Sequence, residues 1–318
     1  MLSNQIATSN IKMKTYQQLW QSLTPLYDAG EAQAIVRTVL DVKYGMTLTD
    51  IICGKVNEIS ADEERKLEEI IIRLQKGEPV QYVLGEADFA GRSFHVEPGV
   101  LIPRPETAEL CQWIEEDFAG KSTVSPKDSP EDSSKDSPEV SPQATDDARR
   151  ILDICTGSGC IAITLGLNIP NSEVTGWDIS EDALRIAQGN VEMLKARNVR
   201  IEYQDALALP KAAEAADLIV SNPPYICEKE KADMEKNVLE HEPSLALFVP
   251  DEDPLKFYRA IAEYASSTLK PEGALYFEIN PIYEKETREM LLKLDFKDIE
   301  TKEDAFGKKR MMRAKSTK

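Results

Sequence analysis

Residues 152–162 read LDICTGSGCIA, and this short segment carries three local signals in succession. The apolar residues at its start favour a buried strand, the two closely spaced glycines favour a turn, and the apolar residues after them favour the start of a helix. Gly157, Gly159 and Ala162 have the spacing G-x-G-x-x-A, in which glycines let a ligand approach the backbone where a helix begins. The segment therefore predicts the first strand and helix of an α/β domain, with a ligand site at the turn between them.

The chain after this segment continues to alternate between strand and helix patterns. Strands are expected at residues 150–154, 174–178, 200–203, 218–221 and 274–279, and helices at 160–167, 181–197 and 254–269. Residues 297–301 and 310–314, on either side of Gly307, predict a terminal antiparallel hairpin. Such alternation is typical of a Rossmann-like, doubly wound α/β fold with a mostly parallel sheet.

Shifts in composition divide the rest of the chain. We expect a disordered N-terminus at 1–12, a small helical domain at 13–77, a β-hairpin linker and stiff loop at 78–107, and the α/β domain at 108–318 with a disordered insertion at 121–147. Helical spacing of apolar residues supports the second region, where Ser60 and Glu63 form a capping box. Alternating apolar residues, interrupted by glycines, support the β-hairpin in the linker. The insertion is acidic and rich in serine and proline.

The composition narrows the classes of protein to which this chain can belong. The net charge of −18 argues against direct nucleic-acid binding, because phosphate recognition usually needs a basic face. Five cysteines without a CxxC pair indicate free thiols in a reducing cytoplasm, and two histidines are too few for a histidine-based metal site. No apolar run approaches the roughly 20 residues that a membrane helix requires. A protein or small-molecule substrate is therefore favoured.

Residues 219–225 read IVSNPPY and form a second informative segment. A buried strand is expected to end here at a rigid turn, because Pro223 and Pro224 fix their own φ and restrict the residue before each of them. Such a turn holds two acceptors, the side-chain oxygen of Asn222 and the carbonyl oxygen of Pro223, in a fixed geometry. Together they suit a planar NH2 group, and Tyr225 offers an aromatic face for it. The same sequence would also serve merely to end a strand.

Acidic residues lie at the ends of the predicted strands nearest the glycine turn. Asp178 ends the second of these strands, where a carboxylate can accept hydrogen bonds from a ribose diol, which fits NAD as well as other nucleotide cofactors. Asp153 lies directly before the turn, where it would repel a pyrophosphate but accept hydrogen bonds from an ammonium group, which favours S-adenosylmethionine. Asp205 and Ala206 follow the third strand and could bind adenine, although Asp205 could also be a helix N-cap.

Taken together, these motifs resemble a known family. Residues 153–159 and the Asn-Pro-Pro-Tyr turn are similar to class I S-adenosylmethionine-dependent methyltransferases that act on planar nitrogen. The flanking segments narrow the resemblance to the release factor glutamine methyltransferases, the PrmC/HemK family. These segments are GEPVQYVLG at 77–85, LIPRPET at 101–107 and HEP at 241–243.

This resemblance implies an enzyme that methylates the side-chain amide nitrogen (N5) of the glutamine in the Gly-Gly-Gln motif of class 1 peptide chain release factors. It also implies a helical domain that helps to hold the release factor, and a cytoplasmic location with no membrane partner. The catalytic turn would comprise Asn222, Pro223, Pro224 and Tyr225. The S-adenosylmethionine site would comprise Asp153, Cys155, Thr156, Gly157, Ser158, Gly159, Asp178, Asp205, Ala206 and Asn222, with no metal.

The chain departs from the family pattern at three places. Cys155 stands where the family has the first glycine of its cofactor loop, and it fits there unless the backbone φ is positive. Residues 248–253, FVPDED, replace a glycine-containing sequence, and the insertion at 121–147 is atypical. Arg104 and Glu106, between prolines, are expected to pair with each other. Two other functions remain open at this point, an adenine-N6 DNA or RNA methyltransferase and an NAD-dependent oxidoreductase.

Overall fold

The computed structural model describes residues 14–119, 148–210 and 215–318. Contacts divide the chain into two compact units, of which the first contains the residues up to Glu86 together with Glu235–His241. The second contains Ala87–Met234 and Glu242–Lys318. The predicted disordered N-terminus and the predicted insertion lie outside the described residues.

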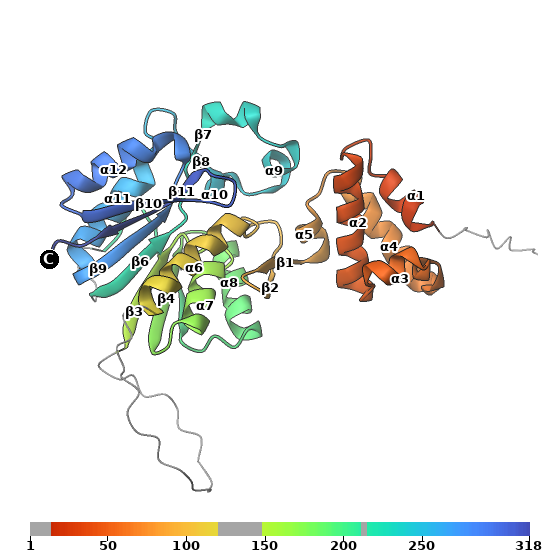
Figure 1. Ribbon diagram of the computed structural model, residues 1–318, viewed down its shortest axis with the longest axis horizontal. Coiled ribbons are helices and arrows are strands. Elements are labelled where there is room, and N and C mark those ends of the chain that lie inside the picture. The colour runs from red at the N-terminus through yellow and green to blue at the C-terminus, as the bar shows by residue number, and fades with distance from the viewer. Residues whose placement is uncertain (1–13, 120–147, 211–214) are drawn as a thin grey trace, which may run out of the picture. The chain divides into compact units, whose positions relative to one another are not determined.

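Short helices build the first unit (Figure 1). They are α1 (Tyr16–Gln21), α2 (Ala29–Tyr44), α3 (Leu48–Ile52), the 3-10 helix η1 (Lys55–Glu58), α4 (Ala61–Leu74), α5 (Val80–Leu84) and α9 (Lys236–His241). Leu40, Ile71 and Leu74 are among the buried residues of the apolar core, to which α9 contributes no residue. The predicted capping box starts α4, since the Glu63 backbone N–H donates to Ser60 Oγ and the Ser60 N–H donates to the Glu63 carboxylate.

The predicted β-hairpin linker differs from the structure at its start. Residues 80–84 form the helix α5, which ends at Gly85 with φ +79°, because their apolar side chains pack on the helical core instead of alternating across a strand. The hairpin itself consists of β1 (Glu86–Phe89) and β2 (Arg92–His95). Phe89 and Phe94 pack edge to face across it, with ring centroids 5.9 Å apart.

A seven-stranded sheet organises the second unit, with the order β10-β11-β9-β6-β3-β4-β5. Its strands are β3 (Arg149–Ile154), β4 (Ser172–Asp178), β5 (Val199–Tyr203), β6 (Ala216–Ser221), β9 (Leu269–Glu278), β10 (Lys297–Glu303) and β11 (Lys309–Lys315). All neighbours from β5 to β9 pair in parallel, whereas β11 pairs antiparallel with both β9 and β10. The predicted Rossmann-like sheet with a terminal antiparallel hairpin is therefore confirmed.

Helices cover both faces of this sheet (Figure 1). One face packs against α6 (Pro105–Ala119), α7 (Cys160–Asn168) and α8 (Glu181–Met193), and the other against α11 (Lys256–Thr268) and α12 (Glu284–Lys293). An apolar core lies on each face of the sheet. Successive side chains of the central strand β3 point to opposite faces, so Ile151 packs in one core and Leu152 in the other. Short elements complete the unit: β7 (Ile226–Cys227), η2 (Glu228–Asp233), α10 (Ser244–Leu247), β8 (Phe248–Val249) and η3 (Pro281–Tyr283).

The central strands β3 and β6 place the two informative segments side by side. Ile154 pairs with Ser221 at the carboxyl ends of these parallel strands. The glycine turn therefore starts at Cys155 directly beside the turn that starts at Asn222. Chain connections leave in opposite directions from this point of the sheet, which is where open α/β sheets bind their ligands.

Candidate active site

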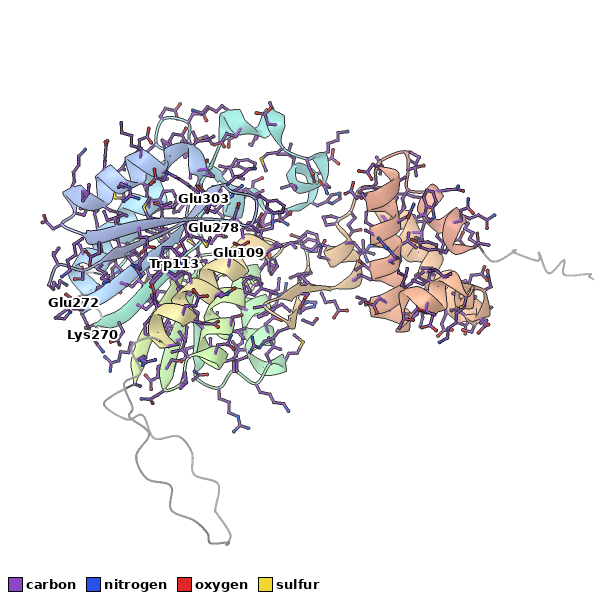
Figure 2. The ribbon with its side chains drawn as sticks, in the orientation of Figure 1. Glu109, Trp113, Lys270, Glu272, Glu278 and Glu303 are labelled. Carbon is purple, nitrogen blue, oxygen red and sulfur yellow. The ribbon has the colours of Figure 1, made fainter. Side chains whose placement is uncertain are left out.

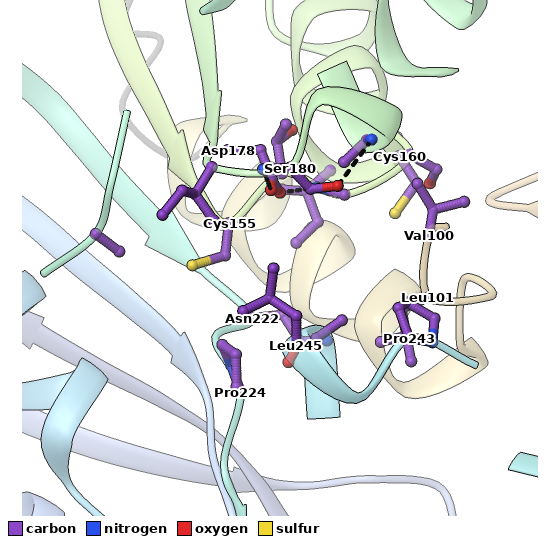
Figure 3. Close-up of a pocket in the computed structure, with 18 of the residues that line it drawn as sticks. Val100, Leu101, Cys155, Cys160, Asp178, Ser180, Asn222, Pro224, Pro243 and Leu245 are labelled. Atoms are coloured by element: carbon purple, nitrogen blue, oxygen red, sulfur yellow. Dashed lines mark hydrogen bonds between the residues drawn. The ribbon is translucent and has the colours of Figure 1, made fainter. Parts of the chain in front are cut away.

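A pocket of about 940 Å³, including its open mouth, lies at the carboxyl ends of β3, β4, β5 and β6. Figure 3 shows Asp178 and Ser180 on one side of the pocket, across from Asn222 and Pro224.

The pocket brings together most of the residues predicted from the sequence. Its walls include Cys155, Thr156, Gly157, Ser158, Asp178, Asp205, Ala206, Asn222 and Pro224. Asp153, Gly159, Pro223 and Tyr225 are not among its lining residues. We therefore expect these four residues to act through their neighbours or through their backbone.

The loop after β3 follows a left-handed path. Cys155 has φ +63°, Gly157 has φ +56° and Gly159 has φ +80°. The condition under which a cysteine would fit without strain is therefore not met, and Cys155 adopts a conformation that costs a non-glycine residue about 1–2 kcal/mol. A Cβ atom added at Gly157 would meet no atom within 4 Å, so the backbone there faces open space that a ligand can enter. A Cβ atom at Gly159 would lie 3.2 Å from Ala187 Cβ, so this glycine permits close helix packing.

Asp153 supports this loop from beneath. Its side chain is fully buried, and Oδ2 accepts hydrogen bonds from Thr156 Oγ1 at 2.6 Å and from the Ala162 backbone N–H at 3.1 Å. Oδ1 finds no partner among the described residues. Burial raises the pKa of this carboxyl group to about 7, against the lowering effect of the two hydrogen bonds. The direct contact with an ammonium group that the sequence suggested is not supported by this geometry, because the carboxyl group is enclosed by the loop.

Asp178, the last residue of β4, lies on the pocket wall and organises the opposite side of the loop. Its carboxylate accepts hydrogen bonds from the backbone N–H groups of Gly157 and Ser180, each at 2.9 Å. Burial raises its pKa, and the hydrogen bonds from Ser180, Gly157 and Ile179 oppose that rise. The carboxylate keeps further lone pairs that can accept hydrogen bonds from a ligand.

Asp205 lies in a turn after β5. Its Oδ1 accepts a hydrogen bond from the Leu207 N–H at 2.8 Å, and the Ala208 N–H donates to its backbone carbonyl at 3.0 Å. Residues 206–208 form a turn and a bend, and no helix follows Asp205 within the described residues up to 210, so the alternative role as a helix N-cap does not apply. Asp205 and Ala206 both line the pocket.

The turn after β6 carries Asn222, whose side-chain amide is hydrogen-bonded to a described residue at its nitrogen end only. Asn222 Nδ2 donates to Thr107 Oγ1 at 3.2 Å. Neither Asn222 Oδ1 nor the Pro223 carbonyl oxygen receives a hydrogen bond from any described residue. The turn therefore offers two acceptors beside the pocket, as the sequence predicted for a planar NH2 group.

A buried hydrogen-bond network behind this turn was missed by sequence reasoning. Glu278, which ends β9, accepts from Thr107 Oγ1 at 2.5 Å and from the Tyr225 hydroxyl at 3.0 Å. Arg310 donates to the same Tyr225 hydroxyl at 3.3 Å. Tyr225 is thus tied to Glu278 rather than exposed as an aromatic wall. A lone acid at the end of an otherwise apolar strand, ALYFE at 274–278, was the signal available in the sequence.

Arg104 does not pair with Glu106 as expected. Its guanidinium contacts the carboxylate of Glu242, which also accepts a hydrogen bond from the Ile102 N–H at 3.2 Å. Glu242 is buried, so it fastens the proline-rich loop at 101–105 to the segment that carries Pro243 and Leu245 into the pocket wall.

Comparisons with known proteins agree with this arrangement. A family model described as "Methyltransferase domain" matches residues 145–304, and one described as "PrmC N-terminal domain" matches residues 24–85. A "Release factor glutamine methyltransferase" of Bacteroides thetaiotaomicron is 46% identical over 295 residues, which cover 92% of this chain and 96% of the relative. The chain belongs to the release factor glutamine methyltransferase family.

Other members of the family align over almost the whole chain. The Flavobacterium psychrophilum member is 37% identical, covering 95% of this chain and 98% of its own length. The Bacillus subtilis member is 35% identical, covering 94% and 96%. Among solved structures, the hMettl16 catalytic domain in complex with MAT2A 3'UTR hairpin 6 has a TM-score of 0.50 at 14% identity, covering 81% of this chain and 82% of that one. That likeness supports the fold alone.

The second unit of this methyltransferase is a Rossmann-like, S-adenosylmethionine-dependent catalytic domain. The residues of the pocket fit this cofactor. Gly157 leaves open space beside its backbone, Asp178 offers a carboxylate, and Ile179, Leu245 and Phe257 give the pocket apolar walls. The NAD-dependent oxidoreductase alternative is set aside by the family membership. Within the described residues, no helix is long and apolar enough to cross a membrane.

Proposed function

We propose that this enzyme transfers the methyl group of S-adenosylmethionine to the side-chain amide nitrogen (N5) of the glutamine in the Gly-Gly-Gln motif of class 1 peptide chain release factors. The relatives that are named release factor glutamine methyltransferase align with this chain over nearly their full length. The observation that carries the proposal is the Asn222 turn, whose two open acceptors match the two hydrogens of a primary amide.

The chemical difficulty is the low nucleophilicity of an amide nitrogen, whose lone pair is delocalised into its carbonyl group. When bound, S-adenosylmethionine supplies an electrophilic methyl group, whose bond to sulfur breaks, with its electron pair left on sulfur, as the bond to nitrogen forms. Asn222 Oδ1 and the Pro223 carbonyl accept both N–H bonds, so they orient the nitrogen and stabilise the positive charge that grows on it as the bond to carbon forms. The nitrogen then loses a proton to solvent. No side-chain base is needed before methyl transfer.

The other predicted residues have supporting roles in this proposal. Asp178 accepts hydrogen bonds from the ribose hydroxyls of the cofactor, while Asp205 and Ala206 recognise its adenine. The loop from Cys155 to Gly159 lies along the methionine part of the cofactor, and Asp153 holds that loop in place. Pro224 contributes to the wall beside Asn222, and Tyr225 is held behind it.

The proposal also covers partners and location. The helical unit helps to bind the release factor, and the enzyme works in the cytoplasm, where translation takes place. The net charge of −18 argues against direct nucleic-acid binding. Hydrogen exchange of the helical unit, measured with and without an unmethylated release factor, tests the first point: unchanged protection there would contradict it.

The central experiment is mass spectrometry of a purified, unmethylated class 1 release factor after incubation with the enzyme and S-adenosylmethionine. We expect one added methyl group, mapped to the glutamine of the Gly-Gly-Gln motif. Controls are a reaction without cofactor and a release factor in which this glutamine is replaced by alanine. A methyl group on another residue, or no transfer while the enzyme binds the cofactor, would overturn the assigned substrate.

A further inference from the structure

A side-chain amide has two ends that look alike in shape but differ in hydrogen bonding. The proposed reaction needs the acceptor end of Asn222, Oδ1, toward the substrate, and a reversed amide would present donors to another donor. Asn222 lines the pocket, and the shape of its amide does not by itself select one orientation, because the two ends are nearly the same size. Some group behind it must therefore fix which end faces the pocket.

Thr107 is the neighbour in a position to do so. It is buried in α6, and its Oγ1 lies 3.2 Å from Asn222 Nδ2 and 2.5 Å from Glu278 Oε2. A hydroxyl group has one proton to donate. If that proton is directed to the Glu278 carboxylate, the Thr107 oxygen can only accept from Asn222, and it selects the Nδ2 end.

Glu278 accepts hydrogen bonds at both of its carboxylate oxygens. Its side chain is buried, and Figure 2 labels it at the end of β9. The Tyr225 hydroxyl donates to Oε1 at 3.0 Å, and Arg310 donates to the oxygen of that hydroxyl at 3.3 Å. Because Arg310 occupies the Tyr225 oxygen as an acceptor, the Tyr225 proton is also directed to Glu278. The hydroxyl protons of Thr107 and Tyr225 therefore both point to the Glu278 carboxylate and away from Asn222.

We propose that Thr107 and Glu278 are positioning residues for methyl transfer, which fix the amide of Asn222 with Oδ1 toward the substrate amide. This inference rests on the proposed function. Neither residue touches the reacting atoms. Glu278 acts through the proton of Thr107, and Thr107 acts through the Nδ2 group of Asn222.

The test compares Thr107→Val, Thr107→Ser and the parent enzyme with a release factor as substrate. Valine keeps the size and β-branching of threonine but cannot accept a hydrogen bond, so we expect kcat to fall about 10-fold. KM for the release factor and the calorimetric Kd for S-adenosylmethionine should change less than about twofold. Thr107→Ser keeps the hydroxyl and should restore most of the lost turnover, which a purely space-filling role would not produce.

Thr164→Val is a matched control. Thr164 is a buried threonine in α7 of the same unit, and its hydroxyl has no hydrogen-bond partner among the described residues. The same chemical change there should leave kcat as it is in the parent. A Thr164→Val enzyme that loses as much turnover as Thr107→Val would overturn the inference.

Glu278→Gln tests the second step. The glutamine amide can donate to Thr107 Oγ1 and release the threonine proton toward Asn222, which favours the reversed amide, so kcat should fall at least 10-fold on the same reasoning. In an enzyme that already carries Thr107→Val, the same change should lower kcat by less than a further threefold or so, because Glu278 can no longer act through the Thr107 hydroxyl. Equal effects in both backgrounds would contradict a relay through Thr107.

The outcomes separate this inference from the function on which it rests. If the parent enzyme does not methylate the glutamine, the proposed function fails and the positioning role falls with it. If the parent is active and Thr107→Val turns over normally, or loses cofactor affinity instead of kcat, only the positioning role is wrong. Should Thr107→Val fail to fold by circular dichroism, Thr107→Ala, which removes atoms without adding any, takes its place with the same expected result.

Discussion

Asn222 provides the most direct single-residue test of the chemistry. Replacing it with alanine removes one of the two acceptors that would hold the substrate amide, while the glycine loop and Asp178 remain. We expect Asn222→Ala to lower kcat on the order of 10²-fold, the loss typical of removing one preorganised polar contact. Turnover under saturating substrates and cofactor titration calorimetry measure the two effects. Near-normal kcat would refute the catalytic role of Asn222, and a lost cofactor affinity would assign it to binding instead.

Cys155 is strained, and its substitutions should show this. A residue with φ +63° tolerates glycine, so Cys155→Gly should leave the free energy of unfolding within about 1 kcal/mol of the parent or raise it. Valine, which is β-branched, should cost about 2 kcal/mol or more at such a φ. Cys111→Val, also buried but within the regular helix α6, is the control. Denaturant unfolding without cofactor measures these differences, and equal losses at both sites would argue against strain at Cys155.

Asp153 should make stability depend on pH. Its pKa rises from 3.8 to about 7 in the folded protein, so its contribution to stability is fully present below pH 3.8 and is lost as the pH rises through 7. Asp153→Asn stays neutral at every pH. The free energy of unfolding of the variant minus that of the parent should therefore increase between about pH 4 and pH 7 and level off above that. A difference that does not vary with pH would mean that Asp153 titrates normally.

The helix α7 shows how one element depends on a single glycine. Gly159 precedes it with φ +80°, and an added Cβ atom would lie 3.1 Å from Ile163 Cδ1 and 3.2 Å from Ala187 Cβ. Gly159→Ala should therefore destabilise the protein by roughly 1–3 kcal/mol and weaken cofactor binding. Gly189→Ala in the interior of α8 is the matched control, because a Cβ atom there meets no atom within 4 Å. It should stabilise by up to about 1 kcal/mol, and denaturant unfolding that gave both changes the same sign would contradict this account.

Elements with strong periodicity or a clear cap could be predicted from the sequence. The central strands, α7 and the start of α4 at Ser60 follow from local pattern, because each buries one regular face or satisfies its own first turn. The predicted strand character of residues 80–84 was wrong because packing on the helical core overrides alternation in so short a segment. The helix α12 was not predicted, since its polar sequence EKETREMLLK has few apolar residues to set a period.

Within the site, residues close to the glycine turn after β3 or to the proline turn after β6 could be predicted. Pairs of residues that are far apart in the sequence could not. Thr107 and Glu278 are 171 positions apart and meet only because α6 packs on the sheet beside β9. Arg104 likewise finds Glu242 across 138 positions instead of Glu106 two positions away. Local spacing carries no information about such pairs. The buried position of Asp153 also required the loop geometry.

Across the whole molecule, the two compact units have separate apolar cores. Ser60→Ala removes the side-chain cap of α4 and should cost the helical unit about 1 kcal/mol. Hydrogen exchange should then show weaker protection of amides in α2 and α4, with amides of β3 and β6 unchanged. Thr38→Ala in the interior of α2 is the control and should not weaken protection, because its hydroxyl bonds only to the Ala34 carbonyl. Equal loss in both units would show that they unfold as one.

The direction of the central strand β3 also affects which changes in the length of the coding sequence the enzyme can tolerate. Helix α6 ends at Ala119 and β3 begins at Arg149, so the segment between them joins β3 at its amino end. The pocket lies at the other end of this six-residue strand, about 20 Å away. Insertions or deletions of codons in that segment therefore leave the pocket-forming ends of the strands unchanged in sequence, and we expect methyl transfer to tolerate them. Repeats such as the KDSPE at 127–131 and 135–139 can accumulate there by replication slippage.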